Sequence, residues 1–409
     1  MSFKIHWLKE KKKAVKRGEQ LVYEEQRIVG KQIVELFSEK VLVTLCAPPQ
    51  WGKTGVSLYV AYHMCLMRTN PENVFFITGM SDRSWLDQTR ERMLPCWKNN
   101  VYHRNTLHKM RDKILEVDKM RDILLIVDEC HLANKKDFIL GQIFDELSLN
   151  DPSRLKLKNI KILQISATPS NALMDGEEWS SYHERITPRM NDGYVSFQGF
   201  IQEDRVRETK NLGDLEECEE YIEEVTEGSP KYHFIRSVSN GLSGSLSYKQ
   251  ISSNLKSICM KENHSFIEMN MEKTSGEIKK LYKNLSKQPH EHTFILIKNM
   301  LGASKTIDDS FIGSIHESTP SVKDYSSEVQ GLPGRLCGWT KRKTNGPILY
   351  CSQEILEEYI KLYESGFNFE SEGLIWSDSR LKVSEMKSVK VKPSYIRNEL
   401  FSEDSISSI

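Results

Sequence analysis

The sequence predicts an α/β protein with two lobes, each a mostly parallel sheet flanked by helices. Short apolar runs alternate with amphipathic stretches, which is typical of strand, crossover helix and strand in a parallel sheet. This alternation stops near residue 170 and resumes near residue 232, after an acidic run at 214–227. A chain of 409 residues is long enough for two domains.

Four strands are predicted in the first lobe because their residues form nearly continuous β-branched or aliphatic runs, as in strands covered on both faces. They are Val41–Leu45, Val74–Thr78, Ile123–Val127 and Ile160–Ile165. The helical patterns between them are Val56–Met67, Ser84–Met93 and Asp137–Leu147. The first of these helices is apolar nearly all round, so it should be buried. We assign the first domain to residues 1–170.

Residues 171–213 are expected to form a loop-rich connector, because Gly, Asn, Asp, Ser and Pro surround isolated aromatic residues. Residues 214–370 form the second predicted domain. Its strands are Tyr232–Val238, Ser265–Met269, Thr293–Ile297, Phe311–Ile315 and Pro347–Cys351, and its helices are Lys249–Lys261, Glu277–Leu285 and Gln353–Tyr363. The tail, residues 371–409, is expected to be partly disordered and could bind a protein partner.

The composition excludes a membrane-spanning protein and a chain that coats nucleic acid by bulk charge. Charged residues make up 28%, and 57 basic residues equal 57 acidic ones, so any nucleic-acid site must be local. The apolar runs are far shorter than the roughly 20 residues that span a bilayer. None of the eight cysteines forms a CxxC pair, which favours reduced thiols and an intracellular location, cytoplasm or nucleus.

A phosphate-binding loop is predicted directly after the first strand. Its residues are Ala47, Pro48, Pro49, Gln50, Trp51, Gly52, Lys53 and Thr54. In such a loop backbone N–H groups and a helix N-terminus face a phosphate, the lysine reaches the β and γ oxygens, and the hydroxyl binds Mg²⁺. The alternative is an ordinary helix N-terminus, which the flanking strand and apolar helix disfavour.

Two further polar groups close predicted strands. Asp128 and Glu129 follow Ile123–Val127, at the sheet edge where ligands bind in open α/β folds. Asp128 could hold Mg²⁺ through water, while Glu129 orients or deprotonates the attacking water. Ser166 and Thr168 follow the fourth strand, and their hydroxyls could couple the two acids to the other lobe.

The combination of Asp-Glu-Cys-His at 128–131 with Ser-Ala-Thr at 166–168 resembles the superfamily 2 helicases, the DEAD/DEAH-box-like nucleic-acid-dependent ATPases. The resemblance covers roughly Gln20 to Tyr363. It implies two RecA-like domains with ATP and Mg²⁺ in the cleft between them and a nucleic-acid strand across both. The weak second-lobe motifs resemble those of divergent helicases of large DNA viruses or mobile elements.

The resemblance also implies roles for residues of the first lobe. Gln26 corresponds to the family's upstream glutamine, which reads the adenine amino group; the alternative is a surface helix glutamine. The segment with Ser81, Ser84 and Gln88 resembles the first strand-contacting motif, where hydroxyls meet phosphates. Ser81 and Ser84 could equally be helix caps.

In the second lobe, residues 295–308 loosely resemble the family's coupling motif. Gln330 and Arg335 resemble the arginine-finger motif, although one extra residue separates Gln330 from Gly334 and Gly338 stands where a second arginine is expected. Lys341 or Arg342 could replace that arginine, or this segment could be only a turn.

We therefore expect an ATP-dependent nucleic-acid helicase or translocase. DNA and RNA remain open as partners. The alternatives are an ATP-gated clamp or remodeller that does not unwind duplex, a catalytically silent helicase-like scaffold, and a small-molecule P-loop kinase. The kinase is disfavoured because it requires neither Ser-Ala-Thr nor a second α/β lobe.

Overall fold

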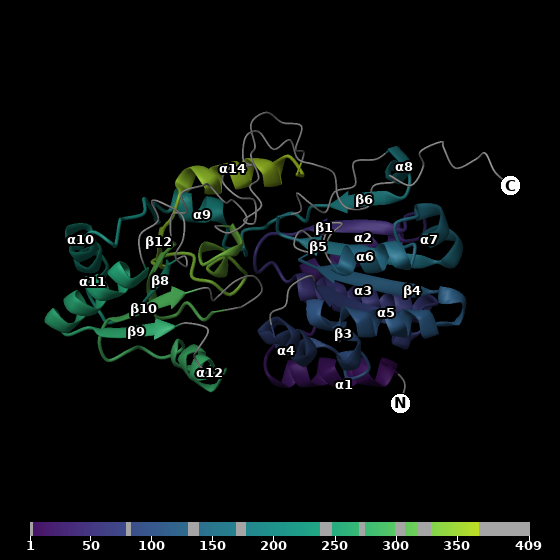
Figure 1. The fold of residues 1–409 in the computed structure, drawn as a ribbon, viewed down its shortest axis with the longest axis horizontal. Coiled ribbons are helices and arrows are strands. Elements are labelled where there is room, and N and C mark those ends of the chain that lie inside the picture. The colour runs from purple at the N-terminus through teal and green to yellow at the C-terminus, as the bar shows by residue number, and fades with distance from the viewer. Residues whose placement is uncertain are drawn as a thin grey trace. The chain divides into compact units, whose positions relative to one another are not determined.

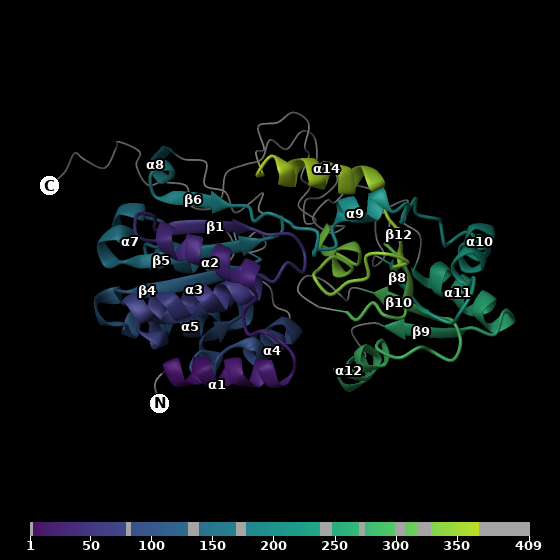
Figure 2. The same ribbon diagram turned by 180° about the vertical axis from the view of Figure 1, so that it is seen from behind.

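The computed structural model describes residues 3–78, 83–129, 139–168, 177–237, 248–269, 275–298, 307–317 and 329–367. Contacts divide these residues into two compact units (Figures 1 and 2). The first unit comprises residues 3–48 and the described part of 52–189, and the second comprises residues 49–51 and the described part of 190–367. The predicted tail, 371–409, lies outside the described residues.

The first unit is built on a six-stranded sheet in which every pair of neighbours is parallel. The strands, in their order across the sheet, are β3 (Val101–Tyr102), β2 (Val74–Thr78), β4 (Ile123–Asp128), β5 (Ile160–Ser166), β1 (Leu42–Cys46) and β6 (His183–Ile186). All residues of β1, β2 and β5 are buried, because helices cover both faces of the sheet.

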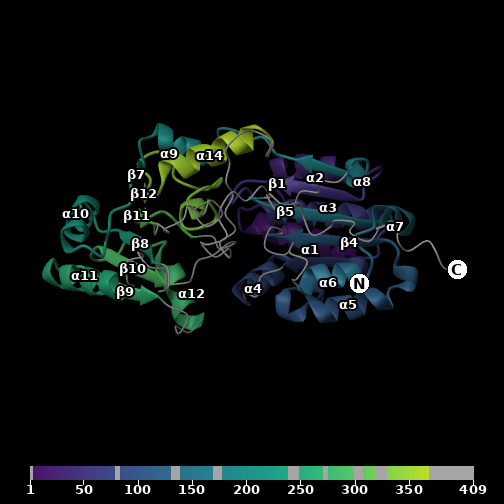
Figure 3. The same ribbon diagram turned by 45° about the horizontal axis from the view of Figure 1, so that its top comes forward.

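Helices pack on both faces of this sheet (Figure 3). The helices of this unit are α1 (Phe3–Lys16), α2 (Glu24–Leu36), α3 (Lys53–Met67), α4 (Arg83–Arg92), α5 (Leu107–Glu116), α6 (Ile139–Glu146), α7 (Pro152–Lys158) and α8 (Glu177–Ser180). On one face, apolar residues of α5, α6 and α7 form a continuous core with the strands. α2 packs along α3, and Trp7 of α1 stacks on Tyr62 of α3 with ring centroids 4.1 Å apart.

The second unit contains another six-stranded sheet with only parallel neighbours. Its strands, in order across the sheet, are β7 (Val206–Arg207), β12 (Ile348–Tyr350), β11 (Ile312–His316), β8 (Tyr232–Ser237), β10 (Thr293–Lys298) and β9 (Ser265–Met269). Its helices are α9 (Phe197–Gln202), α10 (Leu215–Val225), α11 (Tyr248–Lys261), α12 (Ser275–Asn284) and α14 (Gln353–Glu364). The apolar faces of α10 and α11 close the core over β8 and β10.

The predicted fold class is confirmed, since both units are parallel α/β sheets with flanking helices. The proposed connector is divided differently: β6 adds an edge strand to the first sheet, while α9 and β7 belong to the second unit. The sequence pattern missed these elements because β6 and β7 are only four and two residues long. In the part of the chain that the structure describes, no helix has the length and apolar character needed to cross a bilayer.

Candidate functional site

The segment between β1 and α3 is a strand-to-helix loop with two positions that require glycine. Gly52 precedes α3 with φ of 107°, in the left-handed region that glycine adopts without strain. A Cβ atom on Gly52 or Gly55 would collide with the side chain of Gln26. The start of α3, at Lys53 and Thr54, can offer backbone N–H groups to an anion.

The residues predicted for phosphate binding are contiguous in sequence, but contacts divide them between the two units. Ala47, Pro48, Gly52, Lys53 and Thr54 group with the first unit, and Pro49–Trp51 with the second. Lys53 and Thr54 are half-buried in the first turn of α3. The helix N-terminus of the predicted phosphate site, at Lys53 and Thr54, therefore belongs to the first unit.

Gln26 lies beside this loop, although it is 26 positions before Gly52 in the sequence (52 minus 26). It is only 6% exposed, in the first turn of α2, and its Oε1 accepts a hydrogen bond of 3.0 Å from the backbone N–H of Tyr23. The surface-helix alternative is therefore excluded. The structure brings Gln26 to the loop, where its amide group can contribute to a nucleotide site.

The predicted acidic pair lies at the carboxyl end of the central strand β4. Glu129 is 3% exposed and follows Asp128 with a left-handed φ of 50°. The two oxygens of Asp128 accept hydrogen bonds from different donors: Oδ1 from the N–H of Glu129 at 3.1 Å, and Oδ2 from Nε1 of Trp85 at 3.0 Å. Burial and the neighbouring charge of Glu129 raise the pKa of Asp128 to about 6, while Lys53 acts in the opposite direction.

Ser166 and Thr168 are fully buried at the end of β5, next to both motifs. The N–H of Thr168 donates to Oγ of Ser166 at 3.0 Å. Ser166 pairs in register with Cys46 of β1, and its carbonyl accepts from the N–H of Ala47 at 3.1 Å. The Ser-Ala-Thr segment thus fixes the beginning of the predicted phosphate loop, while the preceding residue, Ile165, pairs in register with Asp128.

The donor set fits Mg²⁺. Asp128 and Thr54 supply a carboxylate and a hydroxyl, which are the hard oxygen ligands that this ion prefers. Among the described residues, no group of three or more His, Cys, Asp or Glu side chains could hold a metal ion. An ion that binds through few protein ligands and completes its coordination with phosphates and water matches this arrangement.

The predicted strand-contacting segment is only partly described. Ser81 lies outside the described residues, and Ser84 lies in the first turn of α4 without a described side chain. Gln88 is half-buried one turn further along this helix. Sequence reasoning missed Trp85, whose partner Asp128 is 43 residues away, so that no local spacing indicated the contact.

In the second unit, Gln330 and Arg335 lie together. Arg335 is 3% exposed and closes a short 3-10 helix, Pro333–Arg335. Its NH2 group donates to the carbonyl oxygen of Gln330 at 2.5 Å. A Cβ atom on Gly334 would collide with the carbonyl oxygen of Val329, so the turn before Arg335 requires glycine. Residues 299–306 of the predicted coupling motif lie outside the described residues.

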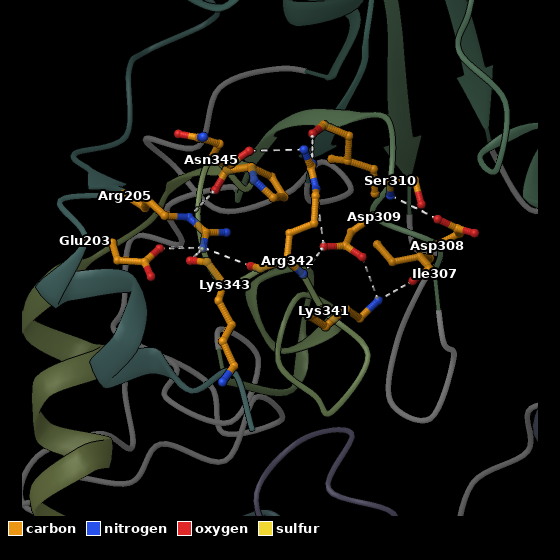
Figure 4. A network of polar contacts seen from close by, with 12 residues as sticks. Glu203, Arg205, Ile307, Asp308, Asp309, Ser310, Lys341, Arg342, Lys343 and Asn345 are labelled. Carbon is orange, nitrogen blue, oxygen red and sulfur yellow. Dashed lines mark hydrogen bonds and ion pairs between the residues drawn. The ribbon is translucent and has the colours of Figure 1, made fainter. Parts of the chain in front are cut away.

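Arg342, the alternative to Arg335, belongs to a network that holds loops of the second unit together (Figure 4). Its guanidinium donates to the carbonyl oxygens of Ile312 at 2.7 Å and Asn345 at 3.1 Å, and lies 3.7 Å from a carboxylate oxygen of Asp309. Lys341 contacts the same carboxylate at 3.9 Å. Arg205 donates to the carbonyl oxygens of Arg342 and Lys343. These contacts give Lys341 and Arg342 a structural role.

No family model and no curated protein matches the chain. Solved structures do. The alignment with the DEAD-box helicase Mss116 bound to ssRNA and UDP-BeF covers 90% of this chain and 78% of the Mss116 chain, at 15% identity and a TM-score of 0.50. The alignment with S. cerevisiae Dbp5 bound to RNA and ADP BeF3 covers 85% of this chain and 92% of the Dbp5 chain, at 14% identity and a TM-score of 0.45. With its two parallel α/β sheets, the chain has the tandem RecA-like fold, which it shares with Mss116.

Proposed function

We propose that this protein is an ATP-dependent nucleic-acid helicase or translocase, which couples ATP hydrolysis to strand movement or duplex unwinding. One observation carries the proposal. Asp128 and Glu129 lie side by side at the carboxyl end of β4, close enough to Lys53 for its charge to act on Asp128. Two adjacent carboxylates, half-buried Asp128 and buried Glu129, beside a strand-to-helix loop form an arrangement suited to a metal-bound nucleotide.

The residues of the first unit would divide the chemistry among themselves. Lys53 would bind the β- and γ-phosphates, and Thr54 and Asp128 would hold Mg²⁺, which when bound neutralises phosphate charge. Glu129 would orient a water molecule and accept its proton as the bond to the γ-phosphate forms. Gln26 would contribute to nucleotide recognition through its amide.

Residues of the second unit and of β5 would link hydrolysis to movement. In this proposal, Arg335 supplies positive charge to the γ-phosphate when the two units close on ATP, and Gln330 supports its turn. Ser166, whose carbonyl oxygen accepts from the N–H of Ala47, and Thr168, whose N–H donates to Ser166, would transmit the change on hydrolysis.

Nucleic acid would bind the first unit at α4, through Ser81, Ser84 and Gln88. Hydroxyl, amide and helix N-terminal groups suit phosphate oxygens, which carry no sequence information. Binding should therefore weaken steeply as salt rises and should not demand one base sequence. Because phosphate contacts are common to DNA and RNA, stimulation of ATP hydrolysis by each type of strand identifies the partner.

Strand-stimulated ATP hydrolysis tests the proposal. The ATPase rate should be measured without nucleic acid and with single-stranded DNA, duplex DNA and single-stranded RNA; at least one should stimulate it. The Glu129→Gln variant should bind ATP and lose hydrolysis, because the side chain keeps its size but cannot accept the proton. The matched control is Glu146→Gln, at an exposed carboxylate that ends α6. Absence of ATP hydrolysis under every condition would contradict the proposal.

A further inference from the structure

Trp85 of α4 donates a hydrogen bond to Asp128, the carboxylate of the proposed metal site. Among the described residues, it is the one side chain of another element that does so. It is 3% exposed in the first turn of α4, and its Nε1–H donates to Oδ2 of Asp128 at 3.0 Å. Arg92, seven residues further along the same helix, lies close enough for its charge to interact with that of Asp128. One face of α4 is therefore directed at the carboxyl end of β4.

The bond restricts how Asp128 can turn. Each oxygen of a carboxylate has two acceptor positions, and the indole N–H and the Glu129 N–H occupy one on each oxygen. The carboxylate plane is thereby fixed while acceptor positions remain for the waters around a metal ion. Groups that hold a metal ligand in this way commonly account for about a 10- to 100-fold difference in metal affinity.

We propose that Trp85 is a positioning residue for the metal ion: its indole N–H holds Asp128 in the orientation that binds Mg²⁺ with the nucleotide. The inference rests on the proposed function, because it takes Asp128 as a metal ligand. It adds a residue outside the predicted motifs, and it joins the metal site to α4, the helix that is proposed to contact the strand.

Removal of the N–H alone tests this role. Trp85→Phe keeps an aromatic ring without the donor. Incorporation of 3-benzothienylalanine at position 85 also keeps the size of indole and replaces N–H with sulfur, so it decides the question if the Phe variant fails to fold. The matched control is Trp97→Phe, because Trp97 is a buried tryptophan of the same unit, packed on Phe76, whose Nε1 has no hydrogen-bond partner among the described residues.

The primary readout is binding of Mn²⁺ in the presence of AMP-PNP, followed by electron paramagnetic resonance. Both Trp85 replacements should weaken Mn²⁺ binding by about tenfold or more, while Trp97→Phe stays within twofold of the wild type. AMP-PNP binding in EDTA should be unchanged. In ATPase assays, the Mg²⁺ concentration for half-maximal rate should rise, and saturating Mg²⁺ should restore most of kcat.

The outcomes separate the two proposals. If the wild type binds Mn²⁺ with AMP-PNP and both Trp85 replacements bind it equally well, Trp85 does not position Asp128 and only this inference is wrong. Equal weakening in Trp97→Phe would assign the effect to packing and would also overturn it. If the wild type binds no Mn²⁺ with the nucleotide, the proposed metal-nucleotide site fails, and the inference fails with it.

Discussion

The two sheets share one architecture but use polar residues differently. In the first, acidic groups of like charge lie together at the carboxyl end of a strand, where half-buried Asp128 and buried Glu129 are adjacent. In the second, a chain of neutral groups crosses the interior. Tyr221 OH contacts Oγ of Ser314 at 2.9 Å, Ser314 contacts Nδ1 of His233 at 2.9 Å, and Nε2 of His233 contacts Nδ1 of His292 at 3.0 Å.

This difference shows which polar groups maintain the fold and which are suited to a ligand. Hydrogen bonds within the protein link the neutral groups of the second sheet and compensate for much of the cost of their burial. Adjacent carboxylates repel one another, and burial strengthens the repulsion. The carboxyl end of β4 thus carries an electrostatic cost that a cation would relieve. Three predictions test this contrast.

The largest effect is expected from Lys53→Ala, compared with Lys161→Ala. Loss of Lys53 removes a charge-assisted contact to the phosphates, so ATP hydrolysis should disappear and ATP binding should be largely lost. Lys161 is a buried lysine of the same unit as half-buried Lys53, but it lies near the amino end of β5 and donates to the carbonyl oxygen of Lys40 at 2.8 Å. Its variant should lose stability and keep nucleotide binding. Nucleotide affinity is measured by titration calorimetry. Equal affinity in both variants would contradict the role of Lys53 in phosphate binding.

A smaller but still large effect is expected from Arg335→Ala, compared with Arg342→Ala. If Arg335 stabilises charge in the transition state, its loss should lower stimulated turnover by about 10³-fold or more and leave ATP affinity within a few fold. Arg342→Ala should instead cost about 2 kcal/mol of stability, because it frees the carbonyl oxygens of Ile312 and Asn345. Single-turnover kinetics and urea unfolding measure these quantities. Normal turnover in Arg335→Ala with lost turnover in folded Arg342→Ala would reverse the assignment.

The smallest effect concerns acid stability of the second unit. Burial lowers the pKa of His316 to about 4, from the roughly 6.5 expected in the unfolded chain. The unfolded state therefore binds the proton first as pH falls, and the stability that neutral His316 contributes is present above pH 6.5 and is lost between about 6.5 and 4. Linkage gives a loss of about 2 kcal/mol from pH 7 to pH 5. Burial lowers the pKa of His233 in the same direction.

The first unit should respond less to the same acidification without nucleotide and metal. Burial lowers the pKa of His183 to about 4, which destabilises the fold as pH falls, whereas Asp128, with its raised pKa, acts in the opposite sense. Labelling with 4,4′-dithiodipyridine in urea at pH 7 and 5, assigned by peptide mass spectrometry to the buried thiols Cys46 in the first unit and Cys218 in the second, reports each unit separately. His316→Asn should reduce the pH dependence at Cys218. An unchanged dependence would contradict the role of His316.

The sequence by itself determined the elements that bury a continuous apolar run. β2 was predicted to the residue, and β1, β4 and β5 to within one residue at their ends, because strands covered on both faces need such runs. It also indicated the loop before α3 and the acids at the carboxyl end of β4, since these motifs are contiguous. Short edge strands such as β6, with little buried surface, gave no comparable signal.

Only the tertiary structure decided which distant residues meet. Gln26 lies against Gly52 and Gly55, and Trp85 reaches Asp128, because the packing of α2 and α4 brings these side chains to the loop and to the end of β4. Likewise, the sequence offered both Arg335 and Arg342 as candidates for the arginine finger. Only the structure shows that Arg342 donates to carbonyl oxygens of its own unit, which gives it a structural role. Spacing along the chain indicates only local periodicity. Hydrogen bonds between residues 30 to 43 positions apart depend on how the helices and strands pack, which a local pattern does not predict.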